Sequence, residues 1–300
     1  LGGIEDGVDG LLASPLTGSG PQLRHSGTLL LATCSVGRRN LLFMRIAAIQ
    51  HDIVWNDRQA NFARLAPMIT AAAAGGARLA LLTETFSTGF AVDVPDLAEP
   101  EGGPSSQFLV EQARQHGIWV AGSCPEVPST TDPADARPAN SFVVAAPDGT
   151  THRYRKIHPF TYGGEHHHFR AGTDLVQITI DGVRISLFVC YDLRFADEFW
   201  QLAPTTDVYL VPANWPESRR AHWMALLQAR AIENQAYVVG CNRVGLGGNG
   251  LQYVGDSRII DPLGELLATG SQGETILFAD ITAERVAQVR DTFRFLPDRR

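Results

Sequence analysis

The sequence predicts an α/β fold in which mixed sheets are covered by helices. From residue 45 onward, short apolar segments of strand length alternate with amphipathic segments of helix length. Three pairs of strand segments are separated only by turn sequences, which adds hairpins to the alternation. The chain has 300 residues, 44% of them hydrophobic, enough for one large domain or two small ones. No internal repeat or long linker interrupts the pattern, so we expect one domain.

The helices are predicted from apolar stripes bounded by capping and stop residues. In the first, Asn56 is the expected cap, Leu65 and Ile69 lie on one stripe, and the pair Gly75-Gly76 ends the helix. The others follow the same logic, with a glycine or a strand after the last periodic residue. Predicted helices cover residues 56–74, 105–116, 219–234 and 282–290.

The strands are predicted from short apolar runs. Turn sequences at residues 147–149, 181–182 and 261–264 join neighbouring runs into hairpins. The spacing leaves open whether the strands form one sheet or two. Predicted strands cover residues 44–50, 79–83, 118–123, 140–146, 151–155, 175–180, 183–190, 207–212, 236–244, 258–260, 265–268 and 275–280.

Composition excludes several classes of function. The formal net charge is −7 and the charged residues are scattered, so no basic patch predicts binding to nucleic acid or to an anionic membrane. No apolar run reaches the roughly 18 residues that span a bilayer. The four cysteines form no C-x-x-C pair, which argues against a disulfide framework or a zinc site and favours reduced thiols in a cytoplasmic protein.

The first 43 residues differ from the rest of the chain. They are rich in Gly, Ser and Leu, carry little charge and show no sustained period. Residues 28–34 resemble a signal-peptide core, but the run is short and lies late, with only Arg24 and His25 immediately before it. We expect residues 1–43 to be a disordered or non-native extension and 44–300 to form the domain. The alternative is a small N-terminal element docked on that domain.

Cys190 is the first candidate for chemistry, because it ends the apolar run 183–190 and is followed at once by polar residues. A side chain at a strand end opens onto the crevice where α/β proteins bind ligands. A thiol there, near backbone N–H groups of a turn, is placed to be ionised and to attack a carbonyl carbon. The alternative is a small buried hydrophobic residue, the usual fate of a free cysteine.

A nucleophilic thiol needs a proton acceptor and a group that stabilises the oxyanion. Among the nine histidines, His158 comes closest to a suitable position. Glu84, after the run 79–83, and Lys156, at another strand end, are more conspicuous. Each alone reads as a solvated charge, but together with a strand-end thiol they would supply a base and a cation.

Three segments resemble the signatures of the nitrilase superfamily of carbon–nitrogen hydrolases. They are residues 82–89 (LTETFSTG), 154–158 (YRKIH) and 190–195 (CYDLRF), in the family's order of Glu, Lys and Cys. The resemblance covers residues 44–300 and implies a four-layer α-β-β-α sandwich without a cofactor, assembled as a homodimer or larger homo-oligomer. One departure is Ala196-Asp197, where the family commonly has Pro-Glu.

The resemblance also implies roles for individual residues. Glu84 would be the general base, Cys190 the nucleophile, and Lys156 with the Tyr191 backbone N–H the oxyanion-binding groups. Glu165 resembles the family's second glutamate, which positions the lysine and offsets its buried charge. Further candidates for substrate binding are Arg194 or Arg219 for a distal carboxylate, and Trp215, Phe90 and Tyr162 as pocket walls.

Finer similarity points to one branch of the superfamily. Residues 164–172, 213–216, 222–223, 229–235 and 241–245 resemble bacterial ω-amidases, which hydrolyse the terminal amide of dicarboxylic acid monoamides such as 2-oxoglutaramate. The alternatives with the same chemistry are an N-carbamoyl amine hydrolase, a deaminated-glutathione amidase and a nitrilase. A non-catalytic interaction module is a more distant alternative. The expected partner is a small-molecule amide.

Two further motifs could suggest other functions, namely metal binding and nucleotide binding. The run Glu165-His166-His167-His168 suggests a metal site, but adjacent side chains cannot all aim at one point and no third ligand is evident, so no metal is expected. Residues 245–250 (GLGGNG) are rich in glycine without a nucleotide-binding fingerprint. A flexible turn over the active site is the expected role of this segment.

Overall fold

The computed structural model describes residues 43–93, 97–129 and 135–299. The extension expected at residues 1–43 therefore lies, except for Phe43, outside the described residues. Within the described part, the strands form two sheets, which resolves the question that the spacing left open. No helix in the described ranges is long and apolar enough to cross a membrane.

The first sheet has the order β14-β1-β2-β4-β5-β6, and β3 pairs with β4. The pairs β1/β2 and β2/β4 are parallel, whereas β14/β1, β4/β5 and β5/β6 are antiparallel. The last strand of the chain thus lies against the first, with Met44 opposite Ile281. The strands are β1 (Met44–Gln50), β2 (Leu79–Leu81), β3 (Glu99–Pro100), β4 (Trp119–Val127), β5 (Ala139–Ala145), β6 (Thr151–Arg155) and β14 (Thr275–Ile281).

The second sheet has the order β11-β12-β10-β9-β8-β7, and β13 pairs with β12. Its centre is parallel, since β8, β9 and β10 run in one direction. The predicted turn at Asp181-Gly182 joins β7 to β8, and both residues have the positive φ of a tight hairpin, 48° and 84°. The strands are β7 (Gln177–Ile180), β8 (Val183–Leu187), β9 (Val208–Ala213), β10 (Tyr237–Asn242), β11 (Val244–Leu246), β12 (Gln252–Ile260) and β13 (Leu266–Ser271).

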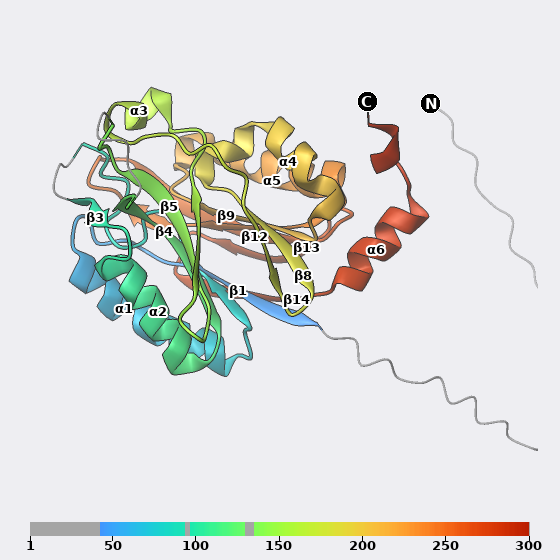
Figure 1. The fold of residues 1–300 in the computed structure, drawn as a ribbon, viewed down its shortest axis with the longest axis horizontal. Helices are drawn as coiled ribbons and strands as arrows, with labels where there is room; N and C mark the ends of the chain where they lie inside the picture. Colours follow the sequence, from blue (N-terminus) through green and yellow to red (C-terminus); the bar gives the residue numbers. More distant parts are fainter. Residues whose placement is uncertain (1–42, 94–96, 130–134, 300) are drawn as a thin grey trace, which may run out of the picture. The chain divides into compact units, whose positions relative to one another are not determined.

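The two sheets pack face to face, and helices cover both outer faces (Figure 1). Helices α1 and α2 lie against the first sheet, and α4 and α5 lie on the far side of the second (Figure 1). This is the expected α-β-β-α sandwich. The helices are α1 (Arg58–Ala74), α2 (Pro104–His116), α3 (Glu165–His168), α4 (Ala196–Leu202), α5 (Arg220–Asn234) and α6 (Ala283–Thr292).

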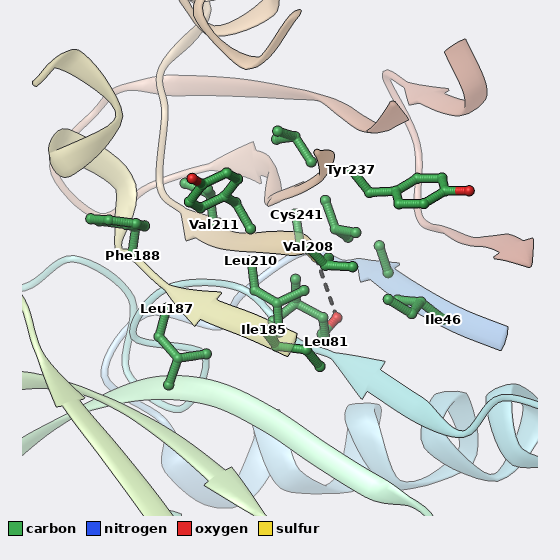
Figure 2. Close-up of a cluster of buried hydrophobic side chains, with 14 of the residues drawn as sticks. Ile46, Leu81, Ile185, Leu187, Phe188, Val208, Leu210, Val211, Tyr237 and Cys241 are labelled. Atoms are coloured by element: carbon green, nitrogen blue, oxygen red, sulfur yellow. Dashed lines mark hydrogen bonds between the residues drawn. The ribbon is translucent and has the colours of Figure 1, made fainter. Parts of the chain in front are cut away.

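The core between the sheets follows from the period of two along each strand. Ile46 and Leu81 of the first sheet meet Ile185, Val208 and Leu210 of the second (Figure 2). The alternate residues of the first sheet point the other way and pack on α1 and α2. Because both faces of each sheet are covered, most strands are apolar throughout, which explains why the sequence showed continuous apolar runs.

The structure corrects the start of the first helix. Asn56 was expected as the cap, but its φ is 58°, whereas a capping residue needs an extended backbone. Asp57 caps α1 instead, and its carboxylate accepts a hydrogen bond of 2.9 Å from the Ala60 N–H. The short elements β3 and α3 were not predicted, because pieces of two to four residues carry no measurable period.

Candidate active site

Glu84 lies three residues beyond the end of β2, and its side chain is fully buried. Its carboxylate accepts hydrogen bonds from Lys156 Nζ (2.8 Å), Asn140 Nδ2 (2.9 Å) and the Asn214 N–H (2.8 Å). The next residue, Thr85, has a φ of 40°, which is strained for a β-branched residue. Such strain persists only where the surroundings enforce it, and it is common at functional sites.

Lys156 follows β6 directly and is also buried. Its ammonium lies 2.8 Å from Glu84 Oε1 and 2.8 Å from Glu165 Oε2. Burial alone would lower the pKa of Lys156, but Glu165, Glu84 and Cys190 together raise this pKa well above its usual value. The ammonium therefore stays protonated at every physiological pH.

Glu165 begins the short helix α3 and is held on both carboxylate oxygens. Besides Lys156, it accepts hydrogen bonds from the Phe160 N–H (2.6 Å) and from Asn140 Nδ2 (3.1 Å). Burial raises the pKa of Glu165, and the nearby Glu84 adds to this effect, whereas Lys156 opposes it. Asn140, in β5, bridges the two glutamates and so fixes their separation.

Cys190 lies where β8 runs into a 3₁₀ turn over Cys190–Arg194. Its φ is 45°, a left-handed conformation that non-glycine residues rarely adopt. Burial raises the pKa of the Cys190 thiol well above its usual value, Glu84 raises it further, and Lys156 opposes both. The expectation of a thiol poised to be ionised by turn N–H groups is therefore wrong for the resting site, because burial and the Glu84 carboxylate outweigh the neighbouring cation.

The site is a buried cluster of two carboxylates, one ammonium and one thiol. The Cys190 thiol lies close enough to Glu84 and Lys156 for both groups to act on its pKa, which Glu84 raises and Lys156 lowers. The structure thus brings together the three side chains that the sequence singled out at strand ends. With the thiol protonated, the cluster has a net charge of −1. Transfer of the thiol proton to Glu84 leaves this net charge unchanged.

The cluster opens into a cavity of about 330 Å³, which is the size of a small-molecule site. Lys156 and Cys190 line its floor. Five of the six residues proposed to bind the substrate or its oxyanion also line it: Phe90, Tyr191, Arg194, Trp215 and Arg219. Tyr162 was proposed as a wall, but it does not line the cavity and is 86% exposed. The remaining lining residues are Trp55, Val92, Asp93, Phe160, Gly163, His168, Asn214, Pro216, Asn249, Leu251 and Tyr253.

The two cavity arginines are held by aromatic rings. The Arg194 guanidinium lies 4.7 Å from the centre of the Trp215 ring, and that of Arg219 lies 5.4 Å from the Phe160 ring. Arg194 also contacts His222 Nδ1 at 3.4 Å. Neither arginine forms an ion pair with any described carboxylate, although Asp93 also lines the cavity.

Several residues of the site were not singled out from the sequence. Asn140 and Tyr253 are the second residues of β5 and β12, Trp55 precedes α1, and Asn249 lies in the glycine-rich segment. Asn249 Nδ2 contacts the Tyr253 hydroxyl at 3.3 Å. The expected place of residues 245–250 over the active site agrees with the lining role of Asn249. Asn140 is a polar residue within an otherwise apolar strand. This is the one signal by which the sequence could have indicated a residue of this group.

The histidines take no part in the cluster. His158 was the nearest histidine candidate, but it faces Asp192 and Glu198 and does not line the cavity. His168 lines the cavity, whereas His166 and His167 contact each other with their rings tilted by 40°. In the described ranges, no group of three or more His, Cys, Asp or Glu side chains is arranged to hold a metal ion.

Comparison with known proteins identifies the family. The carbon–nitrogen hydrolase family model matches residues 45–291. An ω-amidase, YafV, of Escherichia coli K12 is 39% identical over 257 residues, which cover 83% of this chain and 94% of the relative. A 2-oxoglutaramate amidase of Bacillus subtilis is 32% identical over 258 residues, covering 84% and 96%.

The solved structures agree with this match. A carbon–nitrogen hydrolase superfamily protein of Xanthomonas campestris, with an arsenic adduct in its active site, superposes with a TM-score of 0.80 at 33% identity. The match covers 86% of this chain and 97% of that protein. The chain belongs to the carbon–nitrogen hydrolase family. It is an enzyme that hydrolyses carbon–nitrogen bonds other than peptide bonds.

Proposed function

We propose that this enzyme is an ω-amidase that hydrolyses the terminal amide of a dicarboxylic acid monoamide such as 2-oxoglutaramate. One observation carries the choice of substrate: Arg194 and Arg219 line the cavity, and neither forms a salt bridge with a described carboxylate. The charge of Lys156, by contrast, is already met by two carboxylates. If the substrate carboxylate binds at the two arginines, the amide at the other end of this short molecule lies at Cys190.

The names of the relatives support the same substrate. The Escherichia coli protein is an ω-amidase and the Bacillus subtilis protein a 2-oxoglutaramate amidase, and each match covers at least 94% of the relative. The cavity of about 330 Å³ fits a five-carbon acid and leaves little room for a peptide.

In the proposed mechanism, Glu84 removes the thiol proton as Cys190 attacks the amide carbon. Because the cluster keeps its net charge, the transfer separates no charge in the buried site. The thiolate also forms beside the Lys156 ammonium, which stabilises it. The carbonyl oxygen gains the negative charge, and Lys156 with the Tyr191 backbone N–H binds this oxyanion.

The tetrahedral intermediate then collapses as the C–N bond breaks. The proton on Glu84 passes to the amide nitrogen, which leaves as ammonia, and a thioester on Cys190 remains. Glu84, again a carboxylate, takes a proton from water, and the resulting hydroxide attacks the thioester carbon. The C–S bond breaks, the acid is released, and the thiol of Cys190 regains its proton.

Glu165 and Asn140 serve this chemistry indirectly. Glu165 keeps Lys156 protonated and aimed at the cavity, while Asn140 holds Glu84 and Glu165 in place. We further propose a cytoplasmic homodimer or larger homo-oligomer. Trp200, Ile232 and Phe293 are large exposed apolar side chains on the side of α4, α5 and the C-terminal segment, where such an interface would bury them.

Ammonia release from a panel of substrates tests the proposal. We expect the wild-type enzyme to hydrolyse 2-oxoglutaramate and the Cys190→Ala variant not to hydrolyse it. The Cys124→Ala variant is the matched cysteine control. A thiol alkylator should abolish activity and a chelator should not. Turnover of N-carbamoyl amino acids, deaminated glutathione or nitriles without turnover of 2-oxoglutaramate would replace this substrate by the corresponding alternative. An undiminished biological effect of Cys190→Ala would indicate an interaction module.

A further inference from the structure

Asp192 is a buried carboxylate that the mechanism above does not use. It is 1% exposed and forms hydrogen bonds on both oxygens. Oδ2 accepts from the Tyr154 hydroxyl (2.7 Å) and the Val189 N–H (2.9 Å). Oδ1 accepts from the His158 N–H (2.9 Å) and lies 3.1 Å from His158 Nδ1. A buried charge is normally this well paired, because an unpaired one would be costly.

The partners of Asp192 come from the two segments that carry the reacting groups. Tyr154 lies two residues before Lys156, and His158 lies two residues after it. Val189 immediately precedes Cys190, and Asp192 itself lies in the turn that Cys190 begins. The Asp192 carboxylate therefore joins the segment around Lys156 to the segment around Cys190. In each segment, the bonded residues lie on both sides of the reacting residue.

The turn at Cys190 needs such support. A φ of 45° at a cysteine is a strained backbone, which persists only where other interactions enforce it. The Asp192 carboxylate accepts a hydrogen bond from the Val189 N–H, and the Asp192 N–H donates to the Val189 carbonyl at 3.0 Å. Both bonds hold the residue before Cys190, so they fix the direction in which the thiol points.

His158 extends this arrangement to α4. Its Nε2 lies 3.3 Å from Glu198, and its ring stacks on Phe195 with centroids 3.8 Å apart. The charged groups that face His158 are Asp192 and Glu198, with Lys156 further along its own segment. The two ring nitrogens thus each face a carboxylate, Asp192 at Nδ1 and Glu198 at Nε2, and so connect Asp192 to the helix that follows the cysteine turn.

We propose that Asp192 is a positioning residue that holds the Cys190 turn in register with Lys156, and that His158 clamps Asp192 to α4. Asp192 acts through Cys190 and does not touch the substrate, since it does not line the cavity. The inference rests on the proposed function only in assigning the reaction to Cys190 and Lys156.

Asp192→Asn is the decisive variant, because the amide has nearly the same shape but cannot accept from all the donors that face it. We expect kcat to fall on the order of 100-fold, as for a displacement of about 1 Å in a reacting group, while KM changes little. The rate at which iodoacetamide alkylates Cys190, followed on the cysteine peptide by mass spectrometry, should fall as well. This second readout needs no substrate, so it separates a wrong substrate from a wrong role for Asp192.

If Asp192→Asn does not fold, two variants of His158 test the proposal instead. His158→Leu should slow both alkylation and kcat, and His158→Asn, whose amide can replace the Nδ1 donor, should restore much of the loss. Tyr154→Phe, which removes one donor and leaves both backbone bonds, should have the smallest effect. A folded Asp192→Asn enzyme with the wild-type kcat and alkylation rate would overturn the proposal, as would wild-type rates in His158→Leu.

Discussion

The Lys156 ammonium lies 2.8 Å from a carboxylate oxygen of Glu165, and both side chains are 1% exposed. In this environment an isolated ammonium would tend to lose its proton, but an ammonium between Glu165 and Glu84 does not. Glu165 thus sets the charge of Lys156, although Glu165 itself takes part in no chemical step. The first prediction concerns that charge.

Glu165→Gln removes one of the two carboxylates that raise the pKa of Lys156. This pKa should fall, so the ammonium should be lost at a lower pH than in the wild type. We expect kcat to drop on the order of 100-fold at neutral pH, and its alkaline limb to move to lower pH. The pH profile of kcat measures both effects. An unmoved alkaline limb would mean that Glu165 does not control the charge of Lys156.

Arg194→Leu should weaken the binding of substrates that carry a carboxylate. A hydrogen bond to a charged group contributes about 1.5–3 kcal/mol, so KM for 2-oxoglutaramate should rise about 10-fold or more. A neutral amide of similar length is the matched control substrate, and its KM should be nearly unchanged. Arg219→Leu provides the second comparison. Equal losses for acidic and neutral amides would show that these arginines do not bind the carboxylate.

His51 should make the protein less stable in acid. Burial lowers the pKa of this fully buried histidine from 6.5 to about 4. The unfolded chain therefore binds this proton below about pH 6.5, whereas the folded chain binds it only below about pH 4, so stability falls as the pH drops across that window. The loss should be about 3 kcal/mol.

The free energy of unfolding in urea at pH 4, 5, 6 and 7 tests this expectation. His51→Gln should be less stable than the wild type at pH 7, but its stability should depend less steeply on pH. Parallel curves for the two proteins would show that another group causes the acid sensitivity.

Gly240→Ala should destabilise the packing of α5 on the second sheet. A Cβ at this position would lie 2.5 Å from Leu227 Cδ1 and 2.9 Å from Trp223 Cζ2, both in the core. Overpacking of this kind costs about 1–3 kcal/mol, which urea denaturation measures. Gly273→Ala, where a Cβ meets no atom within 4 Å, is the matched control and should have little effect on stability. An equal effect of both substitutions would contradict this explanation.

The sequence predicted the parts of the site that lie at strand ends. Glu84 and Cys190 each follow an apolar run, after β2 and β8, which is visible in the sequence. Lys156 follows the polar strand β6, whose end is marked by the preceding hairpin. The resemblance added Glu165, whose position after Gly164 has no periodic signal. The two-sheet sandwich likewise came from the resemblance, because hydrophobic spacing does not distinguish one sheet from two.

Other features could not be predicted because they depend on contacts between distant segments. The role of Asn140 depends on its bonds to Glu84 and Glu165, which lie 56 and 25 residues away. Asp192 was visible as part of a motif, but two of its partners, Tyr154 and His158, come from β6 and the segment after it, and pairing across sheets has no local signal. The protonated state of Cys190 also depends on Glu84 and on burial, neither of which belongs to its own strand.

The pairing of β14 with β1 has a consequence for biosynthesis. Strand β1 leaves the ribosome early, but its antiparallel neighbour is the last strand of the fold. Until residues 275–281 have been translated, β1 has an open edge on the side opposite β2, the strand that leads to Glu84. A nascent or prematurely terminated chain would therefore expose a strand that can pair with other chains, and it would depend on chaperones to avoid aggregation.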